Sequence, residues 1–463
     1  MQHSSLRTSS KTYFKPLFFL SILALLSGCS SYGVITNEPQ NLGPTNDAKN
    51  YSIKSIIANK PQGKVTLVLA FSGGGTRASA LAYGVLQELN DTQLLINQQD
   101  INLLDEVDVI SAVSGGSFTA AYYGLKGKKT FKEFENIMLK RDLEDELISG
   151  VLRPMNWFAD TGRTEMAIQL YNQSIFKDAN FKDLRNSGGP LILINASDLS
   201  NGVRFSFTQE YFDLLCSDIS EFSVAKAVTA SSAVPLVFNP VVLQNHQPCN
   251  NNAKQQLNLN HKFAQNNYEL LQTIKGLSDY TDNKYPFLQL VDGGITDNLG
   301  LRAIYEIIEL SNGPKTFLQQ VGKTTTQQIA VISVDASTKS AKTMRLSNKI
   351  PSLRQSVEAL SDIQIHRYNA STLELFEQSL QRWSKQVSNN EQQVLPHFIQ
   401  LNFNQLETAE LRDEFNLIPT SLSLTAEQVN KLIHAGRHLL RNNLDFQVLL
   451  QSLDNNSLTS KAH

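Results

Sequence analysis

The sequence predicts an α/β fold in which a mainly parallel central sheet is flanked by helices. Residues 64–71 form a strongly apolar run, which is followed by a glycine turn and then by a helical pattern over residues 78–89. The same order of strand, glycine turn and helix returns over residues 107–125. Two such units in succession are typical of parallel strands that are joined by right-handed crossovers.

Later segments add further elements to this sheet. Four more strands are predicted from short apolar or alternating runs, at residues 190–195, 203–208, 287–291 and 328–335. Apolar residues at helical spacing predict helices within residues 131–184 and at residues 222–228, 353–387 and 426–440. Residues 246–285 are rich in asparagine and glutamine, and we expect them to form a long surface excursion.

Composition places the chain among ordinary globular proteins. It has 463 residues, of which 41% are hydrophobic and 18% charged, and its formal net charge is −2. A chain of this length and apolar content can bury a large core. The near-neutral charge, without a sustained basic patch, gives no support for nucleic-acid binding.

The N-terminus has the pattern of a bacterial lipoprotein signal. Basic residues precede an apolar run over residues 17–26, which is too short to span a bilayer as a stable helix. The run ends in Leu-Ser-Gly-Cys, which resembles a lipobox, so we expect cleavage before Cys29 and a stable lipid anchor on its thiol. Ser30, rather than aspartate, favours the outer membrane over the inner one. An ordinary secretory signal is the alternative.

Two further cysteines, Cys216 and Cys249, could form a disulfide in an oxidising compartment or remain unpaired thiols. The sequence leaves both possibilities open, because it does not give the distance between their Cα atoms.

Ser114 occupies the turn between the predicted strand at residues 107–113 and the helix that follows. A nucleophile elbow holds a serine in such a turn, where Oγ is exposed and the helix N-terminus offers N–H groups to an oxyanion. The usual Gly-x-Ser-x-Gly pattern reads Ala-Val-Ser-Gly-Gly here, with Ala112 in place of the first glycine. An ordinary glycine-rich loop is the alternative interpretation.

Gly73, Gly74 and Gly75 follow the first strand and open the first helix, so their N–H groups suit a developing oxyanion. The loop lacks the Gly-Lys-Ser/Thr of a phosphate-binding loop, and its glycine spacing differs from that of a dinucleotide site. Arg77 could bind an anionic headgroup or lock the loop through hydrogen bonds to carbonyl groups, and the structural role is favoured.

A serine nucleophile needs a base, and none of the eight histidines lies in a recognisable catalytic motif. Asp292 ends a predicted strand and is followed by two glycines. Burial beside Ser114 would raise the pKa of this carboxyl above about 3.9 and bring it closer to neutral pH. The same tripeptide also forms ordinary turns.

Taken in order, the glycine loop, Ser114 and Asp292 resemble the patatin-like phospholipases. Residues 193–198 and 230–240 resemble two further segments of this family, and the similarity spans about residues 65–335. The resemblance implies a three-layer α/β fold and a Ser–Asp dyad. Ser72, where the family often has aspartate, and Ala112 are departures that leave this dyad intact.

The resemblance also implies a role for each matching residue. Ser114 would be the nucleophile and Asp292 the base, Gly73, Gly74 and Gly75 would form the oxyanion hole, and Arg77 would be the motif arginine. The implied activity is that of a lipid acyl hydrolase, of the phospholipase A or lysophospholipase type, acting on a phospholipid or another acyl ester without a cofactor or metal.

Three alternatives remain open at this point. The chain could be an acyltransferase on the same fold, or a non-catalytic lipoprotein that binds or assembles with other molecules. It could also be a hydrolase with a Ser–Asp–His triad, in which His366 or His397 is the third member.

We expect four parts along the chain: a signal peptide (1–28), a lipidated tether (29–60), a catalytic domain (61–340) and a mostly helical C-terminal extension packed on it (341–463). The amphipathic stretch at residues 353–387 is expected to pack one face on the core. Binding to a membrane or covering the acyl site is the alternative for that stretch.

Overall fold

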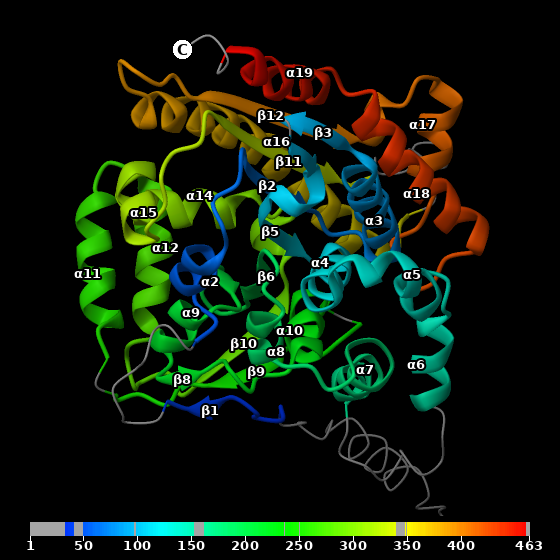
Figure 1. The fold of residues 1–463 in the computed structure, drawn as a ribbon. Helices are drawn as coiled ribbons and strands as arrows, with labels where there is room; N and C mark the ends of the chain where they lie inside the picture. The colour runs from blue at the N-terminus through cyan, green and yellow to red at the C-terminus, as the bar shows by residue number, and fades with distance from the viewer. Residues whose placement is uncertain are drawn as a thin grey trace, which may run out of the picture. The chain divides into compact units, whose positions relative to one another are not determined.

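A computed structural model describes residues 33–40, 50–96, 99–151, 162–235, 237–249, 251–338, 348 and 350–459, so the predicted lipidation site Cys29 lies outside the described residues. From Val34 onwards the chain forms one compact unit (Figure 1). Within the ranges given above, no helix is both long enough and apolar enough to cross a membrane.

An eight-stranded sheet lies at the centre of this unit (Figure 1). Its order is β12 (Leu395–Asn402), β11 (Gln328–Asp335), β2 (Thr66–Phe71), β5 (Val107–Val113), β6 (Leu191–Asp198), β10 (Phe287–Asp292) and β9 (Val241–Gln244), with β7 (Arg204–Ser206) also paired to β6. The strands from β12 to β6 are parallel. Strand β10 is antiparallel to both β6 and β9, and β7 is antiparallel to β6. The predicted mainly parallel sheet is confirmed.

Helices cover both faces of the sheet, which gives the three-layer arrangement. Alternate residues of β2 show this directly: Leu67, Leu69 and Phe71 belong to one hydrophobic cluster, whereas Val68 and Ala70 belong to the other. A strand that is buried on both faces needs apolar residues at nearly every position. This explains why the central strands are continuous apolar runs.

Two crossover helices pack closely on one face. Helix α3 (Gly75–Asp91) follows β2, and α4 (Gly115–Lys126) follows β5. Helix α18 (Ala426–Arg441) packs on α3 through Gly84 and Gly436, where a Cβ would collide with the backbone of the facing helix. The opposite face is covered by α14 (Leu301–Leu310) and α16 (Leu353–Val387).

The other described elements are shorter or peripheral. Two small sheets pair β1 (Glu38–Pro39) with β8 (Ser217–Asp218), and β3 (Gln93–Ile96) with β4 (Gln99–Asn102). The further α-helices are α2 (Ile53–Asn59), α5 (Thr130–Phe134), α6 (Leu143–Val151), α7 (Arg163–Tyr171), α8 (Phe181–Asn186), α9 (Gln209–Leu214), α10 (Val224–Ser231), α11 (Ala253–Phe263), α12 (Tyr268–Asp279), α13 (Gly294–Asp297), α15 (Pro314–Gln320), α17 (Ala409–Asn416) and α19 (Leu444–Thr459).

The structure differs from the sequence-based expectation in the segment at residues 246–285. Instead of a long excursion, it contains helices α11 and α12, which bury Leu257, Leu270 and Ile274. Asn267 caps α12 by accepting a hydrogen bond from the Leu270 N–H at 3.1 Å. In α11 the single buried leucine stands among several amide side chains, whereas α12 buries Leu270, Ile274 and Leu277 at helical spacing.

The C-terminal part also contributes a strand that the sequence analysis did not anticipate. Strand β12 pairs with β11 along eight residues, so the central sheet extends into the region expected to be mostly helical. Its residues alternate between buried and half-exposed positions, as suits an edge strand. Helix α16 begins and ends at the predicted residues, and its second half buries Phe376, Leu380 and Trp383.

The described residues of the expected tether from Val34 onwards are folded onto the body. Strand β1 pairs with β8, and Tyr51 is buried with its hydroxyl bonded to the backbone of Ile192. A disulfide between Cys216 and Cys249, left open by the sequence, lies next to this region. The described residues from Val34 to the start of the sheet therefore belong to the compact unit.

Candidate active site

Ser114 lies in the turn between β5 and α4 with φ 49° and ψ −123°. A positive φ at a residue with a side chain costs about 1–3 kcal/mol and persists only where the surroundings hold it. Here the Ser114 N–H donates to Ser231 Oγ at 2.8 Å. Gly116 permits the close approach of β2, since a Cβ at this position would lie 2.7 Å from the Ser72 carbonyl oxygen. The chain thus builds the strained elbow that its strand–glycine–helix pattern predicts.

Asp292 is the last residue of β10, and its side chain lies beside the Ser114 hydroxyl, which lowers the pKa of the carboxyl. Its Oδ1 accepts from the Gly294 N–H at 2.7 Å. Burial raises the pKa of Asp292 to about 6, while these two interactions act in the opposite direction. The fold therefore joins the two predicted residues in one buried pair, of which Ser114 is 7% and Asp292 9% exposed.

Ser231 holds both members of this pair in place, a role that the sequence did not reveal. Besides accepting from Ser114, its Oγ donates to the Asn195 carbonyl oxygen at 2.6 Å. Its own carbonyl oxygen accepts from the Gly293 N–H at 3.0 Å. The available signal was the run of small residues at 230–233, which places α10 against both turns.

The three loop glycines do not have equivalent environments. The Gly73 N–H donates to the Asn298 carbonyl oxygen at 3.0 Å, so this amide is already occupied. Within the described part of the chain, the N–H groups of Gly74 and Gly75 have no hydrogen-bond acceptor. Both glycines have positive φ, of 138° and 59°, which favours residues without a side chain. Of the three amides expected to be available to an oxyanion, those of Gly74 and Gly75 therefore are, and that of Gly73 is not.

Arg77 is buried and bonded to the protein through all three guanidinium nitrogens. Nε donates to the Ala336 carbonyl oxygen at 2.8 Å, Nη1 to that of Ile418 at 2.6 Å, and Nη2 to Thr420 Oγ1 at 2.9 Å. Burial lowers its pKa to about 10, so it stays charged at neutral pH. Arg77 therefore has the geometry expected for locking the glycine loop through hydrogen bonds. Its contacts join α3 to the segment after β11, at Ala336, and to the segment after α17, at Ile418 and Thr420.

Asn298 links the glycine loop to the Asp292 turn and was not identified from the sequence. Its carbonyl oxygen holds the Gly73 amide, and its Nδ2 donates to Ser337 Oγ at 3.1 Å. A Cβ at Gly73 would lie 2.8 Å from Asn298 Oδ1, and one at Gly294 would lie 3.2 Å from the same atom. One side chain thus packs between the two glycine turns.

The sequence model of the patatin-like phospholipase family matches residues 69–305. The chain belongs to the patatin-like phospholipase family. The match runs from β2 into α14 and includes the glycine loop, Ser114 and Asp292. At the level of this family, lipids are the substrate class and lipid hydrolysis is the activity. A search of curated proteins gave no match.

Several solved structures are similar to this patatin-like phospholipase at low sequence identity. Human GIVD cytosolic phospholipase A2 matches with 14% identity and a TM-score of 0.43, over 93% of this chain and 67% of that one. Its complex with methyl gamma-linolenyl fluorophosphonate matches with 12% identity and a TM-score of 0.39, over 85% and 60%. VipD from Legionella pneumophila matches with 13% identity and a TM-score of 0.24, over 90% and 73%.

The histidines considered for a triad make other contacts in this family member. His366 Nε2 is bonded to the Thr338 carbonyl oxygen at 2.8 Å, and His397 Nε2 to Gln328 Oε1 at 2.7 Å. His397 lies on β12, which is separated from β5 by β11 and β2, or about 14 Å at the usual strand spacing. Neither histidine is bonded to Ser114 or Asp292 in the described structure, so the geometry favours the two-residue pair.

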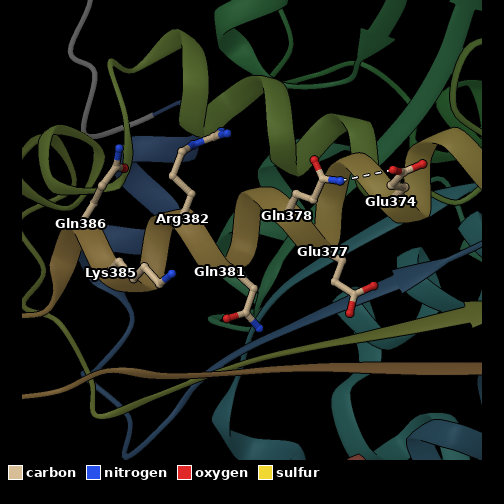
Figure 2. Close-up of a pocket in the computed structure, with 7 residues that line it drawn as sticks. All are labelled: Glu374, Glu377, Gln378, Gln381, Arg382, Lys385 and Gln386. Carbon is tan, nitrogen blue, oxygen red and sulfur yellow. Dashed lines mark hydrogen bonds between the residues drawn. The ribbon is translucent and has the colours of Figure 1, made fainter.

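Two hollows elsewhere on this phospholipase lack the character of an acyl site. One, of about 710 Å³, is lined by seven polar side chains of α16 between Glu374 and Gln386 (Figure 2). The other, of about 400 Å³, includes Thr296 and the charged side chains of Arg204 and Glu306. Among the described residues, no group of three or more histidine, cysteine or acidic side chains could hold a metal ion.

Replacement of Asp292 by asparagine should stabilise the fold at neutral pH. The pKa of Asp292 is raised from 3.8 to about 6, so the folded state binds the proton more tightly than the unfolded chain. The ionised carboxylate therefore lowers the free energy of unfolding by its full amount above about pH 6 and not at all below about pH 4. Asparagine carries no charge and removes this destabilisation. We expect the free energy of unfolding to increase by about 1–3 kcal/mol at pH 8.

Urea unfolding at pH 8 and pH 4 measures this effect. The variant should be more stable than the wild type at pH 8 and should lose that advantage at pH 4. Asp100→Asn, on the exposed strand β4, is the matched control and should show no such pH dependence. An equal difference at both pH values would contradict the raised pKa.

Proposed function

We propose that this chain is a membrane-anchored serine lipid acyl hydrolase in which Ser114 is the nucleophile and Asp292 is the base. The observation that carries the proposal is the buried pairing of these side chains at the elbow, where Ser231 bonds the backbone of Ser114 and of Gly293. A carboxyl with a pKa of about 6 is mostly ionised at neutral pH. It is also a better proton acceptor than an exposed aspartate, because its pKa is closer to the working pH.

The first half of the reaction forms an acyl-enzyme. Ser114 Oγ attacks the ester carbonyl carbon while Asp292 takes the hydroxyl proton, which leaves a tetrahedral oxyanion. We assign the N–H groups of Gly74 and Gly75 to this oxyanion, and to Gly73 the role of holding the loop against Asn298. When the intermediate collapses, the alcohol or lysolipid leaves with the proton from Asp292.

The second half returns the enzyme to its starting state. Asp292 takes a proton from water, and the resulting hydroxide attacks the acyl carbon on Ser114. Ser114 Oγ then leaves and recovers the proton as the fatty acid is released. The N-terminal ends of α3 and α4 both face this centre and favour the negative charge of each intermediate.

We further propose that lipid on Cys29 anchors the enzyme in a bacterial envelope, most naturally on the outer membrane. The lipobox pattern and Ser30 support this placement. The disulfide between Cys216 and Cys249 adds support, because disulfides persist in compartments outside the reducing cytosol.

A covalent probe tests the proposed nucleophile directly. An alkyl fluorophosphonate should react with the lipidated protein in detergent, forming a P–O bond to Ser114 as fluoride leaves. Fragmentation mass spectrometry would distinguish an adduct on Ser114, which we expect, from one on the neighbouring Ser117. Fatty-acid release from mixed bacterial phospholipids would be measured in parallel. An adduct on another residue would overturn the assignment. Neither adduct nor release would favour the non-catalytic alternative.

The rate of hydrolysis should fall as the pH is lowered through about 6, because the protonated Asp292 carboxyl cannot accept the Ser114 proton. Below that midpoint we expect kcat/KM on a monomeric ester to drop about tenfold per pH unit, and above it to level off. Profiles from pH 4.5 to 8 would measure this. Rates independent of pH between 5 and 7 would contradict the proposed base.

A neighbouring carboxyl provides the control for this profile. Burial raises the pKa of Asp297 to about 7, and its Oδ2 accepts from the Ala303 N–H at 3.0 Å. Asp297→Asn should keep the midpoint near that of the wild type. A midpoint that disappears in this variant would assign the titration to Asp297 instead.

A further inference from the structure

We propose that the edge at which the parallel strands end is the surface by which the protein docks on a lipid bilayer. We call this surface the carboxyl edge and define it by six apolar residues: Val34, Leu199, Val234, Val237, Phe287 and Ile295. The inference rests on the proposed function, since it takes Cys29 to be lipidated and a lipid ester to react at Ser114.

The six residues are all exposed, with between 43% and 54% of their surface accessible. Large apolar side chains at single exposed positions are normal, but a group around one opening marks an interaction surface. Their position relative to Asp292 therefore decides whether they form such a group.

The strand register places three of them where the parallel strands end, at different distances from the candidate dyad. Leu199 follows the end of β6, and its N–H donates to the Gln289 carbonyl oxygen at 2.9 Å. Phe287 is the first residue of β10, which runs antiparallel to β6, so it lies at the same edge. Ile295 follows Asp292 by three residues, within α13.

Val234 and Val237 belong to the same edge through the turn after α10. The Asp292 N–H donates to the Ala233 carbonyl oxygen at 3.0 Å, which places Val234 next to the end of β10. The Val237 N–H donates to the Val234 carbonyl oxygen at 3.2 Å, so the two valines share one turn. The two valines thus lie beside the end of the strand that carries the proposed base.

The first described residues of the chain start from this edge as well. Lys226 Nζ donates to the Val34 carbonyl oxygen at 2.9 Å. The Asn37 side chain bonds both backbone groups of Gln244, which pairs with Phe287 across β9 and β10. In Figure 1, β1 and β8 lie together with β9, on the side of the sheet where β9 is the last strand.

Chain length then limits which surface can face the membrane. Cys29 precedes Val34 by five residues, which span at most about 18 Å when fully extended. Strand β6 has eight residues and is about 26 Å long. The end of the sheet at which the parallel strands begin is therefore beyond that reach. Lipid on Cys29 would therefore hold the carboxyl edge, and not its opposite, against the bilayer.

This orientation also suits delivery of a lipid ester to the dyad. Phe287 precedes Asp292 by five residues of strand, or about 17 Å. An acyl chain that spans one hydrocarbon leaflet has a similar length, about 15 Å, so it could extend from the bilayer surface to the dyad. An acyl chain that leaves the bilayer for Ser114 would pass the apolar side chains of the carboxyl edge. These side chains would keep the chain out of water along its path.

Depth-dependent quenching tests the docking surface. The full lipidated protein, with a fluorophore on Phe287→Cys or Val237→Cys, would be placed in vesicles of bacterial phosphatidylethanolamine and phosphatidylglycerol that contain brominated chains. The matched control is Leu444→Cys. Leu444 is apolar and 81% exposed, and its helix, α19, packs beside β12. We expect quenching at both test positions to be at least threefold stronger than at the control. Equal or stronger quenching at Leu444 would overturn the proposal.

A rate comparison supplies the second measurement. Phe287→Asp should lower the ratio of hydrolysis on vesicles to hydrolysis of a monomeric ester by about tenfold, whereas Leu444→Asp should not change that ratio. An unchanged ratio in Phe287→Asp would contradict docking through this edge.

Two readouts on the wild type separate this proposal from the proposed function. Mass spectrometry of the N-terminal peptide reports lipid on Cys29, and hydrolysis of the monomeric ester reports the dyad. If both are present without preferential quenching, docking fails and the function stands. If Cys29 carries no lipid, the argument from chain reach fails and the docking proposal with it.

Discussion

Replacement of Ser114 by alanine should reduce ester hydrolysis by at least about 10⁴-fold, because it removes the atom to which the acyl group is proposed to bond. The nearest hydroxyls offer no ready substitute, since Ser117 Oγ donates to the Ser114 carbonyl oxygen at 2.5 Å and Ser231 Oγ to that of Asn195 at 2.6 Å. Fatty-acid release from bacterial phospholipids measures the loss.

The fold should survive this change. Alanine keeps the backbone N–H that donates to Ser231 Oγ, and both residues carry a Cβ at the strained φ of 49°. We therefore expect the melting temperature to stay within a few degrees of the wild type. Ser117→Ala is the matched control on the same helix. Activity that survives Ser114→Ala and is lost in Ser117→Ala would move the nucleophile to Ser117.

Gly115→Ala should have the largest effect on stability. A Cβ at Gly115 would collide with the backbone of Gly75, including its carbonyl oxygen, and neither backbone segment can rotate away as a side chain could. The elbow and the glycine loop would have to separate, which we expect to cost about 3 kcal/mol or more and to abolish hydrolysis. Urea unfolding together with the yield of soluble protein measures this loss.

Gly189→Ala is the control for the glycine prediction. The nearest atoms to a Cβ at Gly189 lie at 3.4 Å and 3.5 Å, which is ordinary van der Waals contact. That variant should differ from the wild type by less than about 1 kcal/mol. Wild-type stability and activity in Gly115→Ala would show that the two turns are not packed as described.

The central strands and their helices could be predicted because burial on both faces imposes a local pattern. Strand β5 begins and ends at the predicted residues, and β11 does the same. Strand β12 escaped prediction because an edge strand needs only alternating burial, and its second residue is Pro396. Helix α11 escaped prediction because it buries only Leu257 among several amide side chains, whereas α12 was missed although it buries Leu270, Ile274 and Leu277 at helical spacing.

At the site, the sequence pointed to the residue types but not to their mutual support. Ser114 and Asp292 stand in recognisable turns, so each could be proposed from its neighbours in the chain. The contacts of Ser231 and the occupied amide of Gly73 depend on residues far away in sequence. No local pattern encodes such pairings, because the folded backbone alone brings their partners together.

The docked N-terminal segment has a consequence for the order of events during synthesis and folding. Asn37 obtains its two backbone partners only when Gln244 has emerged, more than two hundred residues later in the chain. Strand β1 likewise waits for β8. Residues that leave the ribosome first are thus among the last to find their places. The completed body then draws this segment onto itself.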